Sequence, residues 1–313
     1  MSDFRPHLAM KLNIGASQFS FVPHPLFPDD KNEVFATEGG EAMVYQLCEV
    51  ASGKLWALKV SKAHFRGKHI LRSTNALAPY AHLPGLTLGK RVCFTRATHP
   101  ALIAAHPGLE YAVLMPWISG PSWAGLLANR SANASTESYT PQAAMKLAIA
   151  MAQVLWDLEA HSLAHTDIAG SNVILMPGFN QVELLDLENL YMPNSPVPRQ
   201  CSQGTPGYQH RSLDRNGYWR PDGDRFSGAI IITEMLTWCD VRVQAQTPFK
   251  AESLFALEEL QQINTPRWRV VRDALWNICP PALRLFDQAW SSSDLSQCPE
   301  LSTWAMTLIQ TRQ

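Results

Sequence analysis

The spacing of hydrophobic and polar residues predicts mainly strands in the first third of the chain and mainly helices in the remainder. Residues 34–60 predict strands around a turn at Ser52 and Gly53, because apolar runs flank this small, flexible pair. One short helix is expected over 69–78, and the apolar segment 110–118 is typical of a buried strand.

Helical patterns dominate the second part of the chain. A long helix is expected over 141–161, where a proline stands near the start. The short apolar segments 172–176 and 182–187 predict two strands joined by a Pro-Gly turn, and the pattern is helical from about residue 224 onward. Polar stretches that predict loops lie at 131–138 and 190–210.

The order of these patterns predicts the fold class. Residues 1–33 contain four prolines and show no clear period, so we expect an irregular N-terminal extension there. Strands followed by helices, without an internal repeat, favour an α+β fold of two lobes.

Composition excludes several classes of protein. With 46% hydrophobic residues, 17% charged residues and a formal net charge of −1, the chain is not expected to be disordered or attracted to nucleic acid. No apolar run reaches the roughly 18–20 residues of a membrane helix, and the polar start does not fit a secretion signal. The six cysteines are widely spaced without a Cys-x-x-Cys pair, which favours reduced thiols over a zinc site. We therefore expect a cytoplasmic protein without a membrane or nucleic-acid partner.

One group of polar residues carries the strongest chemical signal. Asp167 and Asn172 stand at the start of the predicted pair of short strands, and Asp186 stands at its end. A hairpin would place Asn172 and Asp186 side by side, where two oxygen donors suit Mg²⁺. Asp167, one loop turn away, could accept a proton from an attacking hydroxyl or orient it. Each aspartate alone is more often a turn residue or a helix cap, but this joint spacing is much rarer.

Two features of the first third are compatible with phosphate binding. Lys59 ends a predicted strand, where it is either a solvated tip or a phosphate ligand in a cleft. Gly39 and Gly40 predict a turn between strands, and the backbone N–H groups of such a turn can approach phosphates closely.

In combination, these residues resemble the eukaryotic-type (bacterial Hanks-type) protein kinase superfamily over about residues 34–310. The similar segments, with their family counterparts, are 37–44 (glycine-rich loop), 165–172 (catalytic loop), 186–188 (metal-binding triplet), 204–208 (end of the activation segment) and 224–235 (a buried helix opened by a structural Asp). The family's Ala-Pro-Glu is replaced by residues 210–212, so its usual buried ion pair is not expected.

The resemblance implies a bilobal, protein-kinase-like α+β fold. A small β-rich N-lobe would span 34–115 and a larger helical C-lobe would span 116–313, with a hinge near 115–119. Lys59 would hold the α- and β-phosphates of ATP, and Asp167 would be the catalytic base. Asn172 and Asp186 would hold Mg²⁺ (or Mn²⁺), and Asp224 would bond the backbone of the catalytic loop. The implied nucleotide-binding residues are Thr37, Gly39, Gly40, Ala42, Val44, Ala57, Lys59, Met115, Pro116 and Ile118.

The expected hinge can supply the hydrogen bonds that adenine requires. Pro116 has a carbonyl acceptor but no N–H, and Ile118, two residues later, has both groups. Met115 has a flexible thioether that fills space well behind a base. An ordinary buried strand is the alternative interpretation of this segment.

The function implied by the resemblance is Mg-assisted transfer of the ATP γ-phosphate to a protein hydroxyl, with serine or threonine favoured by residues 204–206. The first alternative is a pseudokinase scaffold, because Thr37 and Ala42 replace two family glycines and no acidic residue in 51–109 can pair with Lys59. The second is an aminoglycoside- or choline-type phosphotransferase, which often has an acidic residue where Glu188 stands.

Basic residues are concentrated in one segment of the first third. Residues 51–109 contain nine Lys or Arg and neither Asp nor Glu. These cations either solvate the small lobe or form a docking face for an acidic partner or a phosphate-bearing ligand.

Overall fold

The computed structural model describes residues 4–28, 30, 33–128, 139–198, 201–212, 217–247, 252–262 and 264–312. The chain forms two compact units, the first of Met1–His82 and Leu86–Ile118, the second of Leu83–Gly85 and Ser119–Gln313. The chain leaves the first unit after Ile118, within the stretch 115–119 that was expected to be a hinge; the kinase-lobe assignment of the two units stays a prediction. The loop predicted at 131–138 lies outside the described residues.

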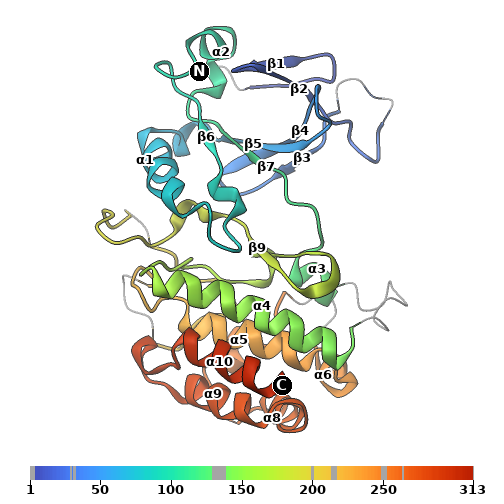
Figure 1. Cartoon of the computed structure of the whole chain (residues 1–313), viewed down its shortest axis with the longest axis vertical. Coiled ribbons are helices and arrows are strands. Elements are labelled where there is room, and N and C mark those ends of the chain that lie inside the picture. Colours follow the sequence, from blue (N-terminus) through green and yellow to red (C-terminus); the bar gives the residue numbers. More distant parts are fainter. Residues whose placement is uncertain are drawn as a thin grey trace. The chain divides into compact units, whose positions relative to one another are not determined.

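The first unit is built on an antiparallel sheet (Figure 1). Its described strands are β1 (Lys11–Ile14), β2 (Ser17–Phe21), β3 (Ala36–Glu38), β4 (Ala42–Glu49), β5 (Leu55–Ser61), β6 (Val92–Cys93) and β7 (Val113–Pro116). The strand order is β1-β2-β4-β5-β7-β6, and β3 pairs with β4. The strands predicted in 34–60 and 110–118 are confirmed, with a turn at residues 50–52 between β4 and β5.

The prediction of an irregular extension over 1–33 was wrong for residues 11–21. These residues form β1 and β2, and β2 pairs with β4 so that Phe19 lies opposite Glu49. Leu12 and Phe19 are buried in the core of the sheet, which supplies the free energy that holds both strands. The alternation of apolar residues on both sides of Gly15 was the overlooked signal, obscured by the prolines that follow.

Two helices belong to the first unit, α1 (Lys68–Leu77) and α2 (Pro100–Ala105). The helix predicted over 69–78 is confirmed as α1. It buries Ile70, Thr74 and Leu77, which recur at helical spacing, and it packs against β6. Its opposite face is exposed to solvent.

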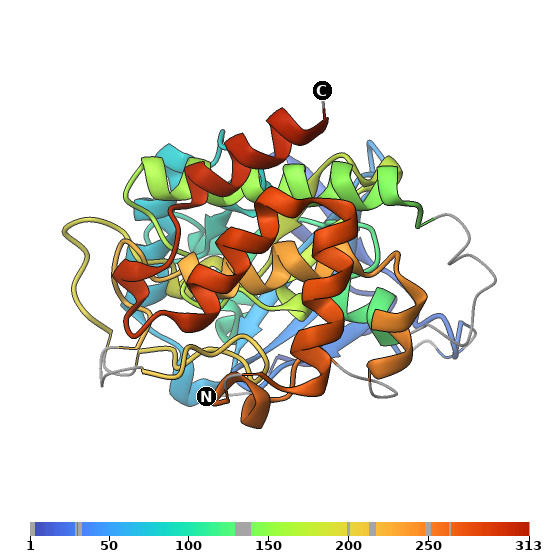
Figure 2. The ribbon, with the colours of Figure 1, turned by 90° about the horizontal axis from the view of Figure 1, so that it is seen from below.

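The second unit is mainly helical (Figures 1 and 2). Its described helices are α3 (Trp123–Ala128), α4 (Pro141–Ala160), α5 (Arg225–Thr237), α6 (Val241–Gln246), α7 (Leu257–Leu260), α8 (Pro266–Ile278), α9 (Pro280–Ser291) and α10 (Leu301–Arg312). The hairpin of β8 (Val173–Leu175) and β9 (Val182–Leu184) completes it. The long helix over 141–161, the two short strands and the helical remainder were all predicted, so the mixed α+β class is confirmed.

Local chemistry explains the start of α4, and packing explains α5. The Thr140 hydroxyl accepts a hydrogen bond from the Ala143 amide, and Pro141 occupies the first helical position, where its missing N–H costs nothing. Helix α5 is buried on all sides, with α4, α8, α9 and α10 packed against it. Among the described helices, none is both long enough and apolar enough to cross a bilayer.

Candidate functional site

The β8–β9 hairpin brings Asn172 and Asp186 to the same end of two paired strands. Val173 pairs with Leu184, and one residue beyond this pair the Leu185 amide donates a hydrogen bond to the Asn172 carbonyl over 2.8 Å. Asp186 is the next residue along the chain. The short hairpin therefore brings Asn172 and Asp186 together at one end of its two strands, as the sequence predicted.

The loop before the hairpin is anchored by the buried carboxylate of the residue that directly precedes α5. Asp224, only 2% exposed, accepts hydrogen bonds from the backbone amides of His165 (2.5 Å) and Thr166 (2.9 Å). Burial raises the pKa of the Asp224 carboxyl, although the two amide donors act in the opposite direction. The structural role predicted for Asp224 is confirmed.

Two residues of the site hold left-handed backbone conformations. Thr166 has φ of 69° and Asp186 has φ of 57°. A β-branched residue such as threonine seldom adopts this region, and such strain persists only where surrounding contacts impose it. For Thr166 those contacts are two hydrogen bonds. Its backbone amide donates to the Asp224 carboxylate, and its hydroxyl donates to the Asn189 carbonyl (2.9 Å).

Further hydrogen bonds fix the loop to the hairpin. A ring nitrogen of buried His165, Nε2, lies 2.6 Å from the Leu185 carbonyl, so it carries the proton and donates. The Asn172 side-chain amide donates to the Asp167 carbonyl over 2.9 Å. Because its NH₂ group is used in this way, the carbonyl oxygen of the Asn172 amide is the atom available to a ligand.

The half-buried Asp167 carboxylate has a partner that sequence reasoning did not assign. The Thr205 hydroxyl donates to Asp167 Oδ1 over 3.0 Å, although the two residues are 38 positions apart. Thr205 lies between two glycines with positive φ, Gly204 (76°) and Gly207 (92°). A Cβ atom at either glycine would come within 2.6 Å of Tyr218 or Ser253. Both glycines are therefore required for this segment to reach Asp167.

A second buried carboxylate, that of Glu234 in α5, was also missed from the sequence. Each of its oxygens accepts two hydrogen bonds, from the Trp123 indole (2.8 Å), the Tyr208 hydroxyl (2.8 Å), the Ser253 hydroxyl (2.6 Å) and the Leu254 amide (2.7 Å). Complete burial nevertheless raises the pKa of Glu234 to about 7. Glu234 thus ties residues 204–208 and α3 to the centre of the unit. The available signal was that Glu234 is the one acidic residue in α5 and directly follows the run Ala229–Thr233, which is mostly apolar.

Close packing beside this network leads to a stability prediction for Gly170. A Cβ at Gly170 would lie 2.9 Å from both the Glu252 carbonyl oxygen and the Tyr208 hydroxyl, and 3.0 Å from the Ala124 nitrogen. We expect Gly170→Ala to lower the free energy of unfolding by about 1–3 kcal/mol, as overpacking does. Urea denaturation measures this change. The control is Gly40→Ala, where no atom lies within 4 Å of the added methyl group; an equal loss in both variants would contradict the steric explanation.

Residues 210–212, which replace the Ala-Pro-Glu of protein kinases, include a buried histidine that is held by hydrogen bonds between uncharged groups. His210 is buried, and its Nε2 lies 2.9 Å from the Ser292 hydroxyl, which in turn lies 3.2 Å from the Cys298 sulfur. Burial lowers the pKa of His210, and the adjacent Arg211 lowers it further, so the ring is neutral near pH 7. His210 and Ser212 are therefore fastened by uncharged groups to Ser292 and Ser293, which lie between α9 and α10, while the Arg211 guanidinium donates to the Trp290 carbonyl of α9.

In the first unit, the sheet register places most of the predicted nucleotide-binding residues on one face. Lys59 pairs with Val44 and with Val113, while Ala57 pairs with Met115. Directly paired residues share a face, as do residues two apart on a strand. The predicted residues on this face are Thr37, Ala42, Val44, Ala57, Lys59 and Met115. The opposite face carries Leu47, Leu58 and the rest of the unit's core.

The remaining predicted residues flank this face. Gly39 and Gly40 form the turn between β3 and β4, where the Gly39 amide donates to the Ala42 carbonyl over 2.8 Å. Pro116 ends β7 opposite Trp56, and Ile118 follows as the last residue of the unit. The acidic residue that the family places on a helix to pair with the strand lysine is not present in α1.

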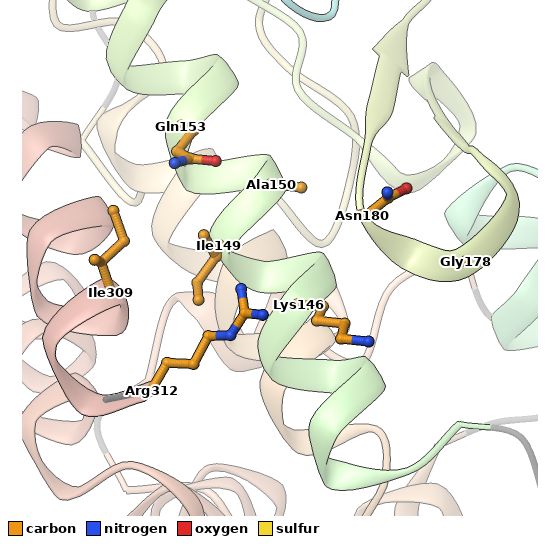
Figure 3. Close-up of a pocket in the computed structure, with 8 residues that line it drawn as sticks. All are labelled: Lys146, Ile149, Ala150, Gln153, Gly178, Asn180, Ile309 and Arg312. Carbon is orange, nitrogen blue, oxygen red and sulfur yellow. The ribbon is translucent and has the colours of Figure 1, made fainter.

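No metal cluster or described pocket adds to this site in the described part of the chain. The part of the chain that the structure describes holds no cluster of three His, Cys, Asp or Glu side chains suited to a metal ion. A pocket of about 510 Å³ lies on the second unit, along α4, α10 and the turn of the hairpin (Figure 3). Its lining residues do not include any residue of the predicted site; they are Lys146, Ile149, Ala150, Gln153, Gly178, Asn180, Ile309 and Arg312.

Comparison of the sequence with known protein families and with curated proteins finds no match in either.

Proposed function

We propose that the protein is a protein kinase that transfers the γ-phosphate of ATP to a serine or threonine hydroxyl of a protein substrate. The observation that carries this proposal is the arrangement of Asp167, Asn172 and Asp186 around one short hairpin, held by the buried Asp224 carboxylate. Phosphoryl transfer needs positioning and charge neutralisation more than covalent chemistry, so few groups suffice.

Each residue has a distinct task in this proposal. Asp167, oriented by the Thr205 hydroxyl, accepts a hydrogen bond from the acceptor hydroxyl and takes its proton. Lys59, half-buried on the face of the sheet that it shares with Val44 and Ala57, neutralises phosphate charge. The donor set of Asn172 and Asp186, one amide oxygen and one carboxylate, fits Mg²⁺ or Mn²⁺, which prefer such ligands together with water and phosphate oxygens. When bound, the ion would offset charge on the phosphates.

A pseudokinase that binds nucleotide without turnover is the second candidate. The observation that favours it is the absence of any acidic residue from 51–109, which includes α1, so that this segment offers no carboxylate to orient Lys59. A small-molecule phosphotransferase is the third, and the 204–208 segment bound to Asp167 and Glu234 weighs against it because it resembles protein kinases. For any of the three, we propose a cytoplasmic location.

Radiolabelled transfer separates these candidates. Purified protein is incubated with γ-labelled ATP and Mg²⁺, and label is measured on the chain itself, on a mixture of basic and acidic test proteins, and on small alcohols including choline and an aminoglycoside. Label on protein supports the proposal, and label on the alcohols alone contradicts it. If neither is labelled but Mg-ATP raises the melting temperature, the protein is a nucleotide-binding pseudokinase.

The Thr205–Asp167 hydrogen bond provides a sharper test of the proposed base. We expect Thr205→Val to reduce kcat by about tenfold, because an unoriented carboxylate spends less time in the reactive geometry. Thr205→Ser keeps the hydroxyl and should retain most of the activity. Steady-state kinetics with the best-labelled protein measures both variants. Equal activity of the Val and Ser variants would show that this bond does not orient the base.

A further inference from the structure

The first unit carries a surface rich in basic residues that we call the basic ridge. It contains the cations Lys62, Arg66, Lys68 and Arg72 together with His64 and His69; Lys62 and Arg66 are half-buried and the other four are exposed. These six residues fall within eleven consecutive positions, from the end of β5 through the first turn and a half of α1. Lys68 and Arg72 are separated by one helical turn, on the face of α1 opposite the buried Ile70 and Thr74. The fold therefore exposes the charges of Lys68 and Arg72 to solvent.

Neighbouring residues extend the positive charge. Helix α1 packs against β6, and Lys90 and Arg91 stand directly before that strand. Of the chain's 26 Lys and Arg, nine lie in residues 51–109, whereas all 27 Asp and Glu lie elsewhere in the sequence. A near-neutral chain thus concentrates positive charge on one segment, which is a charge patch and not an evenly solvated surface.

Few acidic groups among the described residues neutralise the charge of the basic ridge. Glu38 pairs with Lys62 over 2.9 Å, and the Arg66 guanidinium donates to the Ser61 carbonyl. Among the described residues, no ion pair involves Lys68 or Arg72, and the first turn of α1 has no acidic residue. Like charges one turn apart on a helix repel each other, and cations are unfavourable near a helix N-terminus. An external anion would relieve this repulsion.

We propose that the basic ridge docks an acidic segment of another protein. A short run of Asp, Glu or phosphorylated residues can contact Lys68, Arg72 and the neighbouring cations while the rest of the partner stays away from the molecule. A nucleic acid fits less well, because a long polyanion is repelled by the net negative charge of the residues outside 51–109, which include all 27 Asp and Glu. This inference does not depend on the proposed kinase activity, because it concerns binding without nucleotide.

Fluorescence anisotropy with a labelled peptide of ten glutamates tests the proposal on the full-length chain. We expect Lys68→Ala/Arg72→Ala to weaken binding by about tenfold or more, and Lys68→Glu/Arg72→Glu to abolish it. Binding should also weaken steeply as salt is raised, since exposed charges are screened. A matched peptide of ten glutamines should not bind. Because the substituted side chains are exposed, the melting temperature should stay unchanged.

The pocket of Figure 3 supplies the matched control. Lys146 on α4 and Arg312 on α10 are two exposed helical cations of the second unit, and no ion pair involves either one among the described residues. Lys146→Ala/Arg312→Ala removes the same charge and should change the affinity less than twofold. Equal weakening by both double variants, no binding of the glutamate peptide, or tighter binding of a labelled single-stranded DNA 20-mer would each overturn the proposal.

Discussion

Replacing Asp186 by asparagine is expected to abolish Mg-ATP-dependent phosphate incorporation, with a loss of at least about a thousandfold in rate. The substitution keeps the size of the side chain and its place after β9 but removes the negative charge that the proposed metal site requires. Asp186 is exposed, so the loss should occur without a change in the melting temperature. The measurement is transfer of labelled phosphate under saturating ATP and Mg²⁺.

Asp273→Asn on α8 is the matched control for this prediction. Asp273 is also exposed in the second unit but lies on a helix far along the chain from the hairpin, so its variant should keep wild-type activity. Undiminished turnover in Asp186→Asn would contradict the proposed mechanism. Loss of activity in both variants would mean that the effect is not specific to the site.

The second large effect is expected in the pH dependence of stability, through Glu234. Burial raises its pKa in the folded protein to about 7, whereas an unfolded chain has the ordinary value near 4.5. Between these two values the folded state binds more protons than the unfolded state, so the free energy of unfolding falls as pH rises. The stabilisation is fully present below about pH 4.5 and is lost as the pH passes through about 7. From pH 5 to pH 8 the loss amounts to about 2–3 kcal/mol, at about 1.4 kcal/mol for each pKa unit.

Glu234→Gln isolates this contribution because glutamine does not titrate. At pH 5 we expect the variant to be less stable than the wild type by about 1–3 kcal/mol, since its NH₂ group meets an N–H or O–H donor where the acid has an acceptor. By pH 8 the deficit should shrink or reverse, because the wild type then carries a buried charge. Urea unfolding at pH 5, 6, 7 and 8 measures the difference.

Two further variants test whether Glu234 causes the pH dependence of stability. Tyr208→Phe removes one donor to the carboxylate, so it should raise the pKa of Glu234 further and move the loss of stability to higher pH. Asp273→Asn should leave the pH curve as it is in the wild type. A constant difference between the wild type and Glu234→Gln from pH 5 to pH 8 would contradict a pKa near 7 for the buried group.

Local patterns in the sequence determined most of the elements. The helix α4, the hairpin β8–β9 and the central strands β4, β5 and β7 were predictable because each depends on a periodicity within a few residues. The nearness of Asn172 to Asp186 was predictable for the same reason: a short hairpin leaves its two ends almost no freedom.

Tertiary structure alone decided which distant residues complete the site. Asp224 reaches the His165 amide across 59 positions, Thr205 reaches Asp167 across 38, and Trp123 reaches Glu234 across 111. No periodicity links such pairs, because they meet only once α3, α5 and the segment around 204–208 pack together. The membership of β1 and β2 in the sheet is a case of the same kind, since a strand is stabilised by the neighbour it pairs with and by the core it covers. The chain thus specified its elements locally, while the burial of two carboxylates and the partners that satisfy them arose from long-range packing.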